Sequence, residues 1–334
     1  MHHRPCGDRA AALKTDRYDL RRIAPHADRH KIKIRGNMEF RPIELEMKEL
    51  VERYTKPWHL QCSEYTFTNL YIWGKEAHLE LAEEDGALFF FARYGQGKPF
   101  MFAPLSQDPS ADYGTVLKKA VKEFEKRGEV PCFRAISGPI YEAFKGVEGY
   151  SLEEDRDNAD YVYSAESLCT LAGKKLHAKR NHINKFRAEY GDSFEYVPVT
   201  KDMLEECLAV YDEWILGKDP TEPGALGERC AIERAISAMD VLRIKGGGIR
   251  IGGKLAAFTL GEEIDNEIAV IHIEKADSSV PGLYTIINQQ FAQREFSHMQ
   301  YINREEDMGI PGLRKAKLSY YPAFLIEKYR GYCL

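Results

Sequence analysis

One order of elements occurs twice along this chain: a run of short strands with glycine-containing turns, then an amphipathic helix, then a further strand. Residues 78–105, HLELAEEDGALFFFARYGQGKPFMFAPL, predict strands joined by turns at residues 85–86 and 95–97. Residues 113–128 follow with apolar side chains at helical spacing and a glycine at the end, and residues 131–137 are typical of a strand. This order predicts an α+β unit in which a helix packs on an antiparallel meander.

The second copy of this order occupies the carboxyl half. Residues 241–276 contain strand-like runs separated by glycine-rich turns. A helix over 283–296, a strand over 299–303, a helix over 312–321 and a strand over 323–330 follow. The halves share no visible sequence repeat, but the order of their elements predicts a duplicated α+β unit.

Length and composition limit the class of protein. A chain of 334 residues exceeds the usual size of one hydrophobic core, so two domains are expected. The seven cysteines lie singly, without a second pair of ligands, which indicates reduced thiols, no metal site and a cytoplasmic protein. No run approaches the roughly 18 to 20 apolar residues of a membrane span, and the amino terminus has no apolar signal core. We therefore expect neither export nor an integral membrane segment.

Charge divides the chain at residue 38. Residues 1–37 hold ten Lys/Arg against four Asp, a surplus of six positive charges, and the net charge of −5 then leaves −11 for residues 38–334. Residues 1–37 also lack periodicity and predict a disordered or non-native basic extension, with a nucleic-acid or membrane-surface arm as the alternative. The acidic remainder argues against broad binding to duplex DNA.

Two segments outside the repeated order have an unusual composition. Residues 63–73, SEYTFTNLYIW, are rich in β-branched and aromatic side chains and predict a strand or a buried mixed segment. Residues 167–191 have the period of one helix despite Gly173, with Lys179 inside the apolar stripe and Arg180 at its edge. A lysine on an apolar face is costly unless its ammonium meets a carboxylate or reaches water. Lys179 is therefore expected in a buried ion pair or against an anionic substrate.

Residues 303–322, NREEDMGIPGLRKAKLSYYP, gather ionisable and hydroxyl groups with few apolar side chains to bury. In the predicted helix, Lys317 and Tyr320 share a face by their spacing of three residues. Arg314 and Lys317 are suited to phosphate or carboxylate, or else to surface ion pairs with the acids at residues 305–307. The stretch is thus a candidate binding site.

Three separated segments resemble the bacterial family related to the carboxyl-terminal domain of phosphatidylglycerol lysyltransferase. They are CSEYTFTNLYIW (62–73), GKKLHAKRNHINKF (173–186) and YINREEDMGIPGLRKAKLSYYP (301–322). The resemblance runs from residue 38 to residue 334. It implies two tandem GNAT-like (acyl-CoA N-acyltransferase) domains with mixed sheets flanked by helices. Fem-type peptidyltransferases, which add aminoacyl groups from aminoacyl-tRNA to cell-wall precursors, share this architecture. We expect domains over 38–166 and 192–334, joined by a basic helix over 167–191.

The resemblance also implies a place for the acyl carrier. In the GNAT fold the fourth strand leads through a loop into a helix whose amino end binds a pyrophosphate. The corresponding loop here follows the strand over 269–276 and implies cofactor binding at Ser278, Ser279 and Gly282. The loop lacks the Arg/Gln and the repeated glycines of acyl-CoA loops. Acyl-CoA and aminoacyl-tRNA therefore both stay open as co-substrates, and no tightly bound cofactor is expected.

Catalytic roles follow from the same resemblance. Glu274, at the carboxyl end of its strand, lies where GNAT enzymes often keep a general base, and an ion pair with Lys179 is its alternative. Tyr320 resembles in position the tyrosine that protonates a leaving thiolate, and Tyr321 competes for that role. The residues expected to bind substrate are Lys179, Arg180, Asn303, Arg304, Arg314 and Lys317.

The leading hypothesis is a transferase that moves an acyl or aminoacyl group, with aminoacyl-tRNA as one donor, to an amine or hydroxyl acceptor. The alternatives are an acyl-CoA-dependent N-acyltransferase and a non-catalytic GNAT-fold protein that binds an anionic ligand. Expected partners are a small-molecule or tRNA-linked donor and a local contact with tRNA or a lipid headgroup. If Glu274, Lys179 and Tyr320 lie apart in the fold, the transferase hypothesis loses its mechanism.

Overall fold

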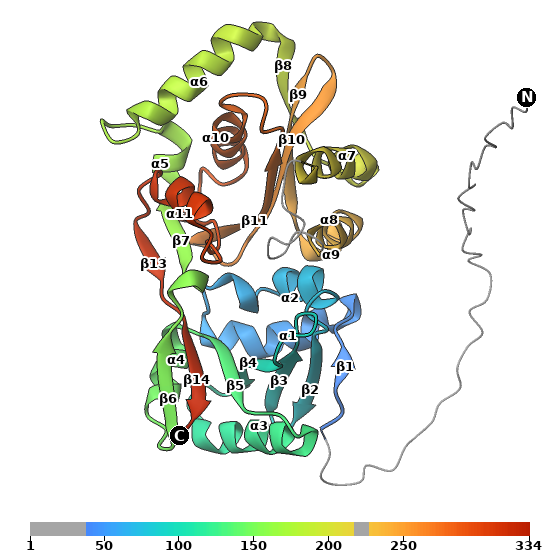
Figure 1. Ribbon diagram of the computed structural model, residues 1–334, viewed down its shortest axis with the longest axis vertical. Coiled ribbons are helices and arrows are strands. Elements are labelled where there is room, and N and C mark those ends of the chain that lie inside the picture. Colours follow the sequence, from blue (N-terminus) through green and yellow to red (C-terminus); the bar gives the residue numbers. More distant parts are fainter. Residues whose placement is uncertain (1–37, 217–226) are drawn as a thin grey trace, which may run out of the picture. The chain divides into compact units, whose positions relative to one another are not determined.

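The computed structural model describes residues 38–216 and 227–334, which belong to one compact unit (Figure 1). The predicted basic extension over residues 1–37 lies outside the described residues. The compact unit contains two mixed seven-stranded sheets flanked by helices, so the predicted α+β class is confirmed. Every helix in the described part of the chain is too short or too polar to cross a lipid bilayer.

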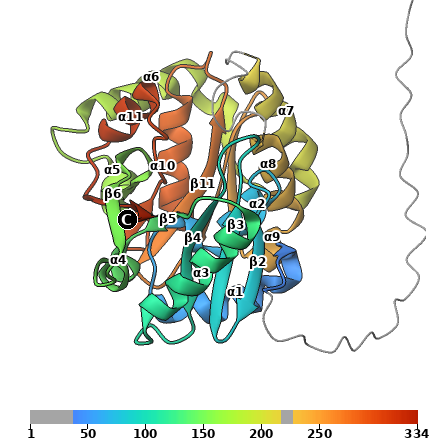
Figure 2. The ribbon, with the colours of Figure 1, turned by 60° about the horizontal axis from the view of Figure 1, so that its bottom comes forward.

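Sheet A is built mainly from the amino-terminal half. Its strands, in spatial order, are β1 (Arg41–Pro42), β2 (Glu80–Glu84), β3 (Ala87–Ala92), β4 (Phe100–Ser106), β5 (Cys132–Ile136), β14 (Tyr329–Cys333) and β6 (Tyr150–Glu154). Its helices are α1 (Lys48–Thr55), α2 (Phe67–Gly74), α3 (Tyr113–Arg127) and α4 (Gly138–Lys145). Helices α1 and α3 both contact β4, as Figure 2 shows for the lower part of the unit. The predicted meander, its turn at residues 85–86 and the helix after it are confirmed.

Sheet B is built mainly from the carboxyl half. Its strands, in spatial order, are β13 (Phe324–Ile326), β7 (Asp160–Ser164), β12 (Tyr301–Asn303), β11 (Ile268–Ala276), β10 (Lys254–Glu263), β9 (Lys245–Ile251) and β8 (Phe194–Pro198). Its helices are α5 (Ala165–Thr170), α6 (His177–Tyr190), α7 (Leu204–Ile215), α8 (Glu228–Ser237), α9 (Met239–Leu242), α10 (Leu283–Glu295) and α11 (Pro311–Leu318). The predicted second meander and the helix after it are confirmed.

The two sheets exchange strands. β7 follows β6 along the chain but joins sheet B, and β14 follows β13 but returns to sheet A. The single strand predicted over residues 323–330 is therefore wrong, because residues 327–328 turn the chain from one sheet into the other. The predicted domain boundary at residue 166 stays a prediction, since the chain passes between the sheets at two places.

Buried charges bind the segments where the chain crosses between the sheets. The Nζ atom of Lys328 lies 2.6 Å from Asp160 Oδ1 and 2.7 Å from Glu64 Oε1. The other oxygen of Asp160 accepts hydrogen bonds from the Ser63 amide and the Asn303 side chain, both at 2.9 Å. Because Asp160 is fully buried and Lys328 nearly so, these bonds satisfy charges that water does not reach.

Of the two alternatives predicted for residues 63–73, the strand is wrong, because residues 67–74 form helix α2, and the segment is instead largely buried. The Thr66 hydroxyl accepts a hydrogen bond from the Asn69 amide, which caps the amino end of this helix. Helix α2 packs against α8 of the other half, and the Arg234 side chain donates to the Tyr71 carbonyl oxygen at 2.9 Å. An apolar helix enclosed between two halves shows no amphipathic period, so propensity alone indicated a strand.

The single helix predicted over residues 167–191 is also wrong, because it is two helices, α5 and α6. Leu171 and Gly173 have positive φ angles of 49° and 83°, a left-handed conformation that a helix cannot contain. The Arg180 guanidinium donates to the carbonyl oxygens of both residues, at 2.7 Å for Gly173. Arg180 thus fixes the break between the two helices.

Removal of the Lys328 charge should destabilise the whole unit. In Lys328→Met, Asp160 and Glu64 keep their buried carboxylates without the ammonium, so we expect a loss of about 3–5 kcal/mol in the free energy of unfolding. Urea unfolding followed by circular dichroism measures this loss. Lys145→Met is the matched control, because the Lys145 ammonium pairs with Glu142 at an exposed position and lies over the Tyr141 ring, and it should cost less than about 1 kcal/mol. Equal losses in both variants would show that Lys328 does not hold the crossing.

Candidate active site

The candidate site lies where two parallel strands of sheet B separate. β11 and β12 pair in parallel only from Ile268/Tyr301 to Val270/Asn303. Beyond that point β11 continues to Ala276 paired with β10 alone, and the chain after β12 turns away. Glu274 of β11 and Arg304 after β12 meet across this opening, with Arg304 Nη2 2.9 Å from Glu274 Oε1.

Both oxygens of the Glu274 carboxylate accept hydrogen bonds from within the chain. Oε1 accepts from Arg304, and Oε2 accepts from the Asn288 side-chain amide of α10 at 3.0 Å. The Glu274 and Arg304 side chains are 11% and 14% exposed, so this ion pair is largely shielded from water. A carboxylate held in this way orients both of its partners.

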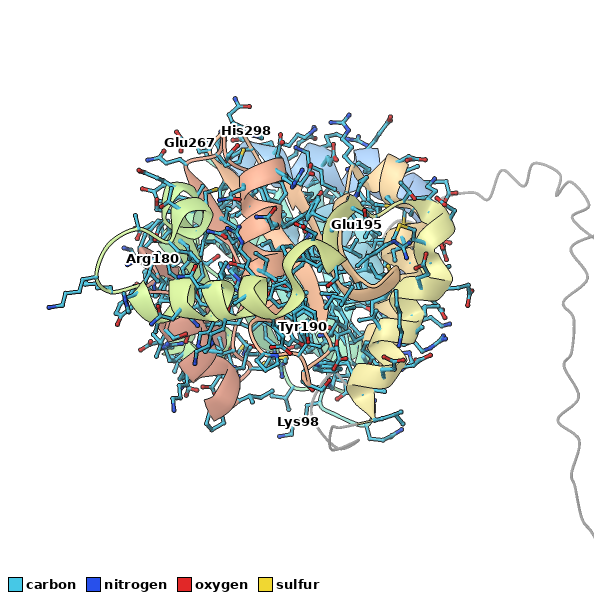
Figure 3. The ribbon with its side chains drawn as sticks, turned by 90° about the horizontal axis from the view of Figure 1, so that it is seen from above. Lys98, Arg180, Tyr190, Glu195, Glu267 and His298 are labelled. Carbon is cyan, nitrogen blue, oxygen red and sulfur yellow. The ribbon has the colours of Figure 1, made fainter. Side chains whose placement is uncertain are left out.

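Tyr320 and Lys179 complete the cluster. The Lys179 ammonium lies 3.8 Å from the centroid of the Tyr320 ring, and the Arg304 guanidinium carbon lies 4.9 Å from it. Lys179 comes from α6, which lies against α10 and crosses the view in Figure 3 from near Arg180 to Tyr190. Four elements distant in sequence therefore bring Glu274, Arg304, Tyr320 and Lys179 together.

Burial and neighbouring charges shift the acid–base properties of this cluster. Burial and the nearby Arg304 cation lower the pKa of Lys179 to about 8, although the Glu274 carboxylate acts in the opposite direction. Burial raises the pKa of Tyr320, and Arg304 opposes that rise. At neutral pH the cluster thus contains a protonated tyrosine and a lysine that exchanges its proton near physiological pH.

Two buried polar atoms of the cluster have no hydrogen-bond partner among the described residues. They are Nη1 of Arg304 and Oδ1 of Asn288. Unpaired buried polar atoms are rare because each one loses its bonds to water. Asn288 was not predicted from the sequence, where nothing distinguishes it from the other polar residues of α10, such as Thr285 and Gln289.

Two further side chains, Lys317 and the buried His272, hold the loop that carries Arg304. Lys317 Nζ donates to the carbonyl oxygens of Arg304 and Glu305, and burial together with Arg304 lowers its pKa to about 8. His272, which the sequence places on the same face of β11 as Glu274, bridges Glu262 at 3.0 Å and Glu305 at 2.8 Å. Burial alone would lower the pKa of His272, but these two carboxylates raise it to about 9. Lys317 therefore positions the loop, and His272 is a charged support for it.

Three other predicted substrate-binding residues lie outside the cluster. Arg180 bonds to the turn between α5 and α6, as described above. Arg314 forms a bidentate pair with Asp307, both contacts at 2.8 Å, and also reaches Asp157. Asn303 donates to Asp160 and to the Gln61 carbonyl oxygen. All three make their contacts within the chain, and their role in substrate binding stays a prediction.

The predicted cofactor loop makes contacts within the chain at both Ser279 and Gly282. Ser279 bonds back to Asp277 through both its amide and its hydroxyl. Gly282 has a φ of 87°, and a Cβ atom placed on it would lie 2.7 Å from the carbonyl oxygen of His182 in α6. The backbone of α6 thus packs against the start of α10, where a GNAT enzyme would bind pyrophosphate. A role for Ser278, Ser279 and Gly282 in cofactor binding stays untested.

The equivalent opening in sheet A contains aromatic side chains. β4 and β5 pair in parallel at Met101/Phe133 and Phe102/Arg134. Farther along β4, three aromatic side chains donate hydrogen bonds to its carbonyl oxygens: Tyr65 to Ala103, Tyr113 to Pro104 and Trp58 to Ser106. Buried aromatic rings line this part of β4, and Arg134 of β5 lies over the Phe100 ring. Sheet B, in contrast, brings an ion pair, a lysine and a tyrosine together, so it carries the candidate site.

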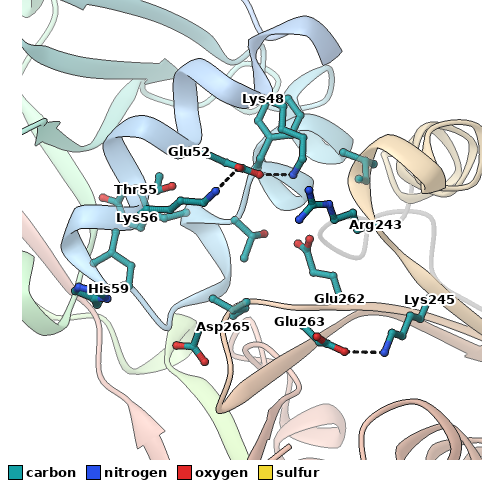
Figure 4. Close-up of a pocket in the computed structure, with 16 residues that line it drawn as sticks. Lys48, Glu52, Thr55, Lys56, His59, Arg243, Lys245, Glu262, Glu263 and Asp265 are labelled. Carbon is teal, nitrogen blue, oxygen red and sulfur yellow. Dashed lines mark hydrogen bonds and ion pairs between the residues drawn. The ribbon is translucent and has the colours of Figure 1, made fainter.

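A separate cavity of about 470 Å³ lies between α1 and the turn joining β10 to β11 (Figure 4). Lys48, Arg243 and Glu262 point toward its interior in this view, and side chains of both charges line it. Glu262, which lines this cavity, also bonds to His272.

In residues 38–216 and 227–334, no group of three His, Cys, Asp or Glu is arranged to hold a metal ion.

Comparison with known proteins identifies the family. A crystal structure of a conserved protein of unknown function from Bacteroides thetaiotaomicron is 35% identical, with a TM-score of 0.81, over 89% of this chain and all of that chain. L-PGS from Bacillus licheniformis shares the fold at 18% identity and a TM-score of 0.60, over 90% of this chain and 94% of its own. FemX shares it at 9% identity and a TM-score of 0.52, over 89% and 98%.

The sequence profile described as "Phosphatidylglycerol lysyltransferase, C-terminal" matches residues 56–332, which is most of the chain. The match contains all of sheet B, all of sheet A except β1 and the last residue of β14, and every residue of the Glu274 cluster. The family resemblance predicted from three sequence segments is therefore confirmed. This chain belongs to the family of phosphatidylglycerol lysyltransferase carboxyl-terminal domains.

Proposed function

We propose that this protein is an aminoacyltransferase that takes its aminoacyl group from aminoacyl-tRNA and transfers it to a hydroxyl or amine acceptor at the Glu274 cluster. The observation that carries the proposal is the convergence of Glu274, Arg304, Tyr320 and Lys179 from four separate elements. The family description, which names lysyl transfer to phosphatidylglycerol, supports the same class of reaction.

The reaction needs one proton acceptor and one site for developing negative charge. We assign the proton to the neutral amine of Lys179, because both oxygens of Glu274 already accept hydrogen bonds. As the acceptor's oxygen or nitrogen bonds to the ester carbonyl carbon, its proton passes to Lys179 and the carbonyl oxygen becomes negative beside Arg304. The ester C–O bond then breaks, and the ammonium of Lys179 returns the proton to the leaving ribose oxygen.

The other two residues support this step. Glu274 orients the Arg304 guanidinium and the Asn288 amide, so its removal would misplace both. Tyr320 stays protonated, because its pKa is raised, and it can donate a hydrogen bond to the leaving oxygen. No covalent intermediate on the enzyme is needed, since the ester is already activated for transfer.

Packing at the start of α10 favours aminoacyl-tRNA over acyl-CoA as the donor. The His182 carbonyl oxygen lies close to Gly282, at the place where a GNAT enzyme binds the CoA pyrophosphate. A carbonyl oxygen presents negative partial charge to that place and so disfavours an anion. α6 and the preceding turn also carry the exposed cations Lys174, Lys175, Lys185 and Arg187, which suit the phosphates of a tRNA.

A direct test compares donors on the full chain. We expect aminoacyl-tRNA to raise the melting temperature by a few degrees at saturation, because a ligand that binds only the folded state stabilises it by about 2.7 kcal/mol at a hundred times Kd. Uncharged tRNA should stabilise less, and acetyl-CoA should have no effect. A parallel assay follows labelled aminoacyl groups into phosphatidylglycerol vesicles and amine acceptors. Stabilisation and acetyl transfer with acetyl-CoA would overturn the proposed donor.

The role of Lys179 predicts a pH dependence. Because only the neutral amine accepts a proton, kcat/KM should rise with pH through about 8 and then level off, after uncatalysed ester hydrolysis is subtracted. Lys179→Met should lower kcat at least about 100-fold and remove this inflection. Lys185→Met, the same change at an exposed position of the same helix, should keep the inflection. An unchanged inflection in Lys179→Met would assign the titration to another group.

A further inference from the structure

The cavity between α1 and the turn joining β10 to β11 contains none of the residues of the Glu274 cluster. Its volume of about 470 Å³ lies in the range of small-molecule sites. Charged side chains of both signs line it in equal number: Lys48, Lys56, Arg243 and Lys245 against Glu52, Glu262, Glu263 and Asp265. The proposed function leaves this cavity without a role.

Most of these charges are already bonded within the lining. The bonded groups are Lys48 and Lys56 with Glu52, Lys245 with Glu263, and Asp265 with two backbone amides of its own turn. Arg243, in contrast, makes no hydrogen bond, ion pair or ring contact with any residue that the structure describes. Glu262 bonds His272 through Oε1 at 3.0 Å, and its Oε2 has no partner in residues 38–216 and 227–334. Both side chains point toward the interior (Figure 4).

The backbone at Arg243 is unusual for an arginine. Arg243 caps the carboxyl end of α9 with a left-handed φ of 61°, and its amide donates to the Met239 carbonyl oxygen. Glycine is the usual residue in this conformation, because the Cβ atom of any other residue is crowded there. Arg243 is exposed, so packing does not account for its side chain. Local strain of this kind is typical of binding sites.

The two unpaired groups restrict the chemistry of a ligand. The planar guanidinium of Arg243 binds a carboxylate through two parallel hydrogen bonds. The free oxygen of Glu262 only accepts hydrogen bonds, and an ammonium is its strongest donor. A simple anion would bind Arg243 but meet the carboxylate of Glu262, and a simple cation would meet the reverse arrangement. A small molecule with both charges satisfies both groups and keeps the balanced charge of the lining.

We infer that this cavity is a second binding site, which takes a small zwitterion with its carboxylate on Arg243 and its ammonium on Glu262. The inference goes beyond the proposed function and requires no transfer reaction. Glu262 also connects the cavity to the candidate active site. His272 bonds Glu262 at 3.0 Å and Glu305 at 2.8 Å, and Glu305 directly follows Arg304. A ligand on Glu262 therefore shares its carboxylate with the side chain that supports the Arg304 loop.

The first test measures binding to the wild-type full chain by calorimetry. The probes are β-alanine, 4-aminobutyrate and 6-aminohexanoate, which hold the same two charges at increasing separation. We expect one of them to bind at least about 10-fold more tightly than the acid and the amine of equal chain length, because each analogue loses one charged hydrogen bond. Equal binding of the singly charged analogues, or no binding of any zwitterion, would overturn the inference.

Replacement of Arg243 separates its charge from its backbone. Arg243→Gly suits the left-handed φ, so we expect it to fold at least as stably as the wild type while binding the zwitterion at least about 10-fold more weakly. His78→Gly is the matched control: His78 is exposed, has a left-handed φ of 41°, lies outside the cavity lining, and should keep wild-type affinity. Wild-type affinity in Arg243→Gly would exclude this site.

Replacement of Glu262 tests the ammonium end. Glu262→Gln should bring the preference for the zwitterion over its acid analogue close to one, since the negative charge is lost. Glu263→Gln, the same change at the next residue, should keep the preference, because Glu263 is already paired with Lys245. An unchanged preference in Glu262→Gln would contradict the assigned orientation. If either cavity variant fails to fold, the probe series on the wild-type chain decides.

Nuclear magnetic resonance of histidine side chains locates the bound probe. The ring signals of His272 should move as the zwitterion binds, because both share the Glu262 carboxylate. The signals of His177, which is exposed on α6 and bonds only to Asn181 among the described residues, should stay in place. Binding that leaves His272 unchanged would place the probe elsewhere and overturn the site, whatever the outcome of the transfer assays.

Discussion

The Lys328–Asp160 ion pair holds the two sheets together where they exchange strands. Asp160 begins β7, which has just left the amino-terminal half, and Lys328 precedes β14, which is about to return to it. Glu64 and Asn303 bind to the same pair from two further segments. Because these charges are buried, they are stable only when all four segments are in place, and separation of the sheets would leave them unpaired.

This crossing also sets the position of the candidate site. Asn303, whose side chain is bound to Asp160, is the last residue of β12, and Arg304 follows it directly. Lys317 and His272 then fix the next turn of the chain, where Glu305 has a left-handed φ of 56°. Arg304 is thereby aimed at Glu274 by contacts on both sides, so the opening between β11 and β12 has a defined geometry before any ligand binds.

The opening between the two parallel strands is built differently in the two GNAT-like parts. In sheet A, hydroxyl and indole donors from buried aromatic rings satisfy the carbonyl oxygens of β4, and the result is a rigid core. In sheet B, an ion pair, a cation over a ring and two unpaired polar atoms occupy the corresponding place. Both parts keep buried side-chain atoms without a partner among the described residues, such as Arg134 Nε in sheet A and Arg304 Nη1 after β12, and the core that the halves share through α2 and α8 stabilises both.

Local sequence pattern by itself determined both meanders, the long helices α3 and α10, and the gathering of ionisable residues after β12. These features depend on hydrophobic period, turn residues and caps, which act over a few residues. The family resemblance indicated Glu274 and Tyr320, the apolar stripe of the predicted helix indicated Lys179, and the charged stretch after β12 contained Arg304; the structure brings those four together. The same reasoning did not separate them from Arg180, Arg314 and Asn303, because the residue types are equally suited to a ligand or to an internal partner.

Only tertiary structure decided which cations have internal partners, that α2 is a helix enclosed between the two halves, and that β7 and β14 change sheets. It also exposed Asn288, since an unpaired amide oxygen is defined by what surrounds it in three dimensions and not by its neighbours in sequence.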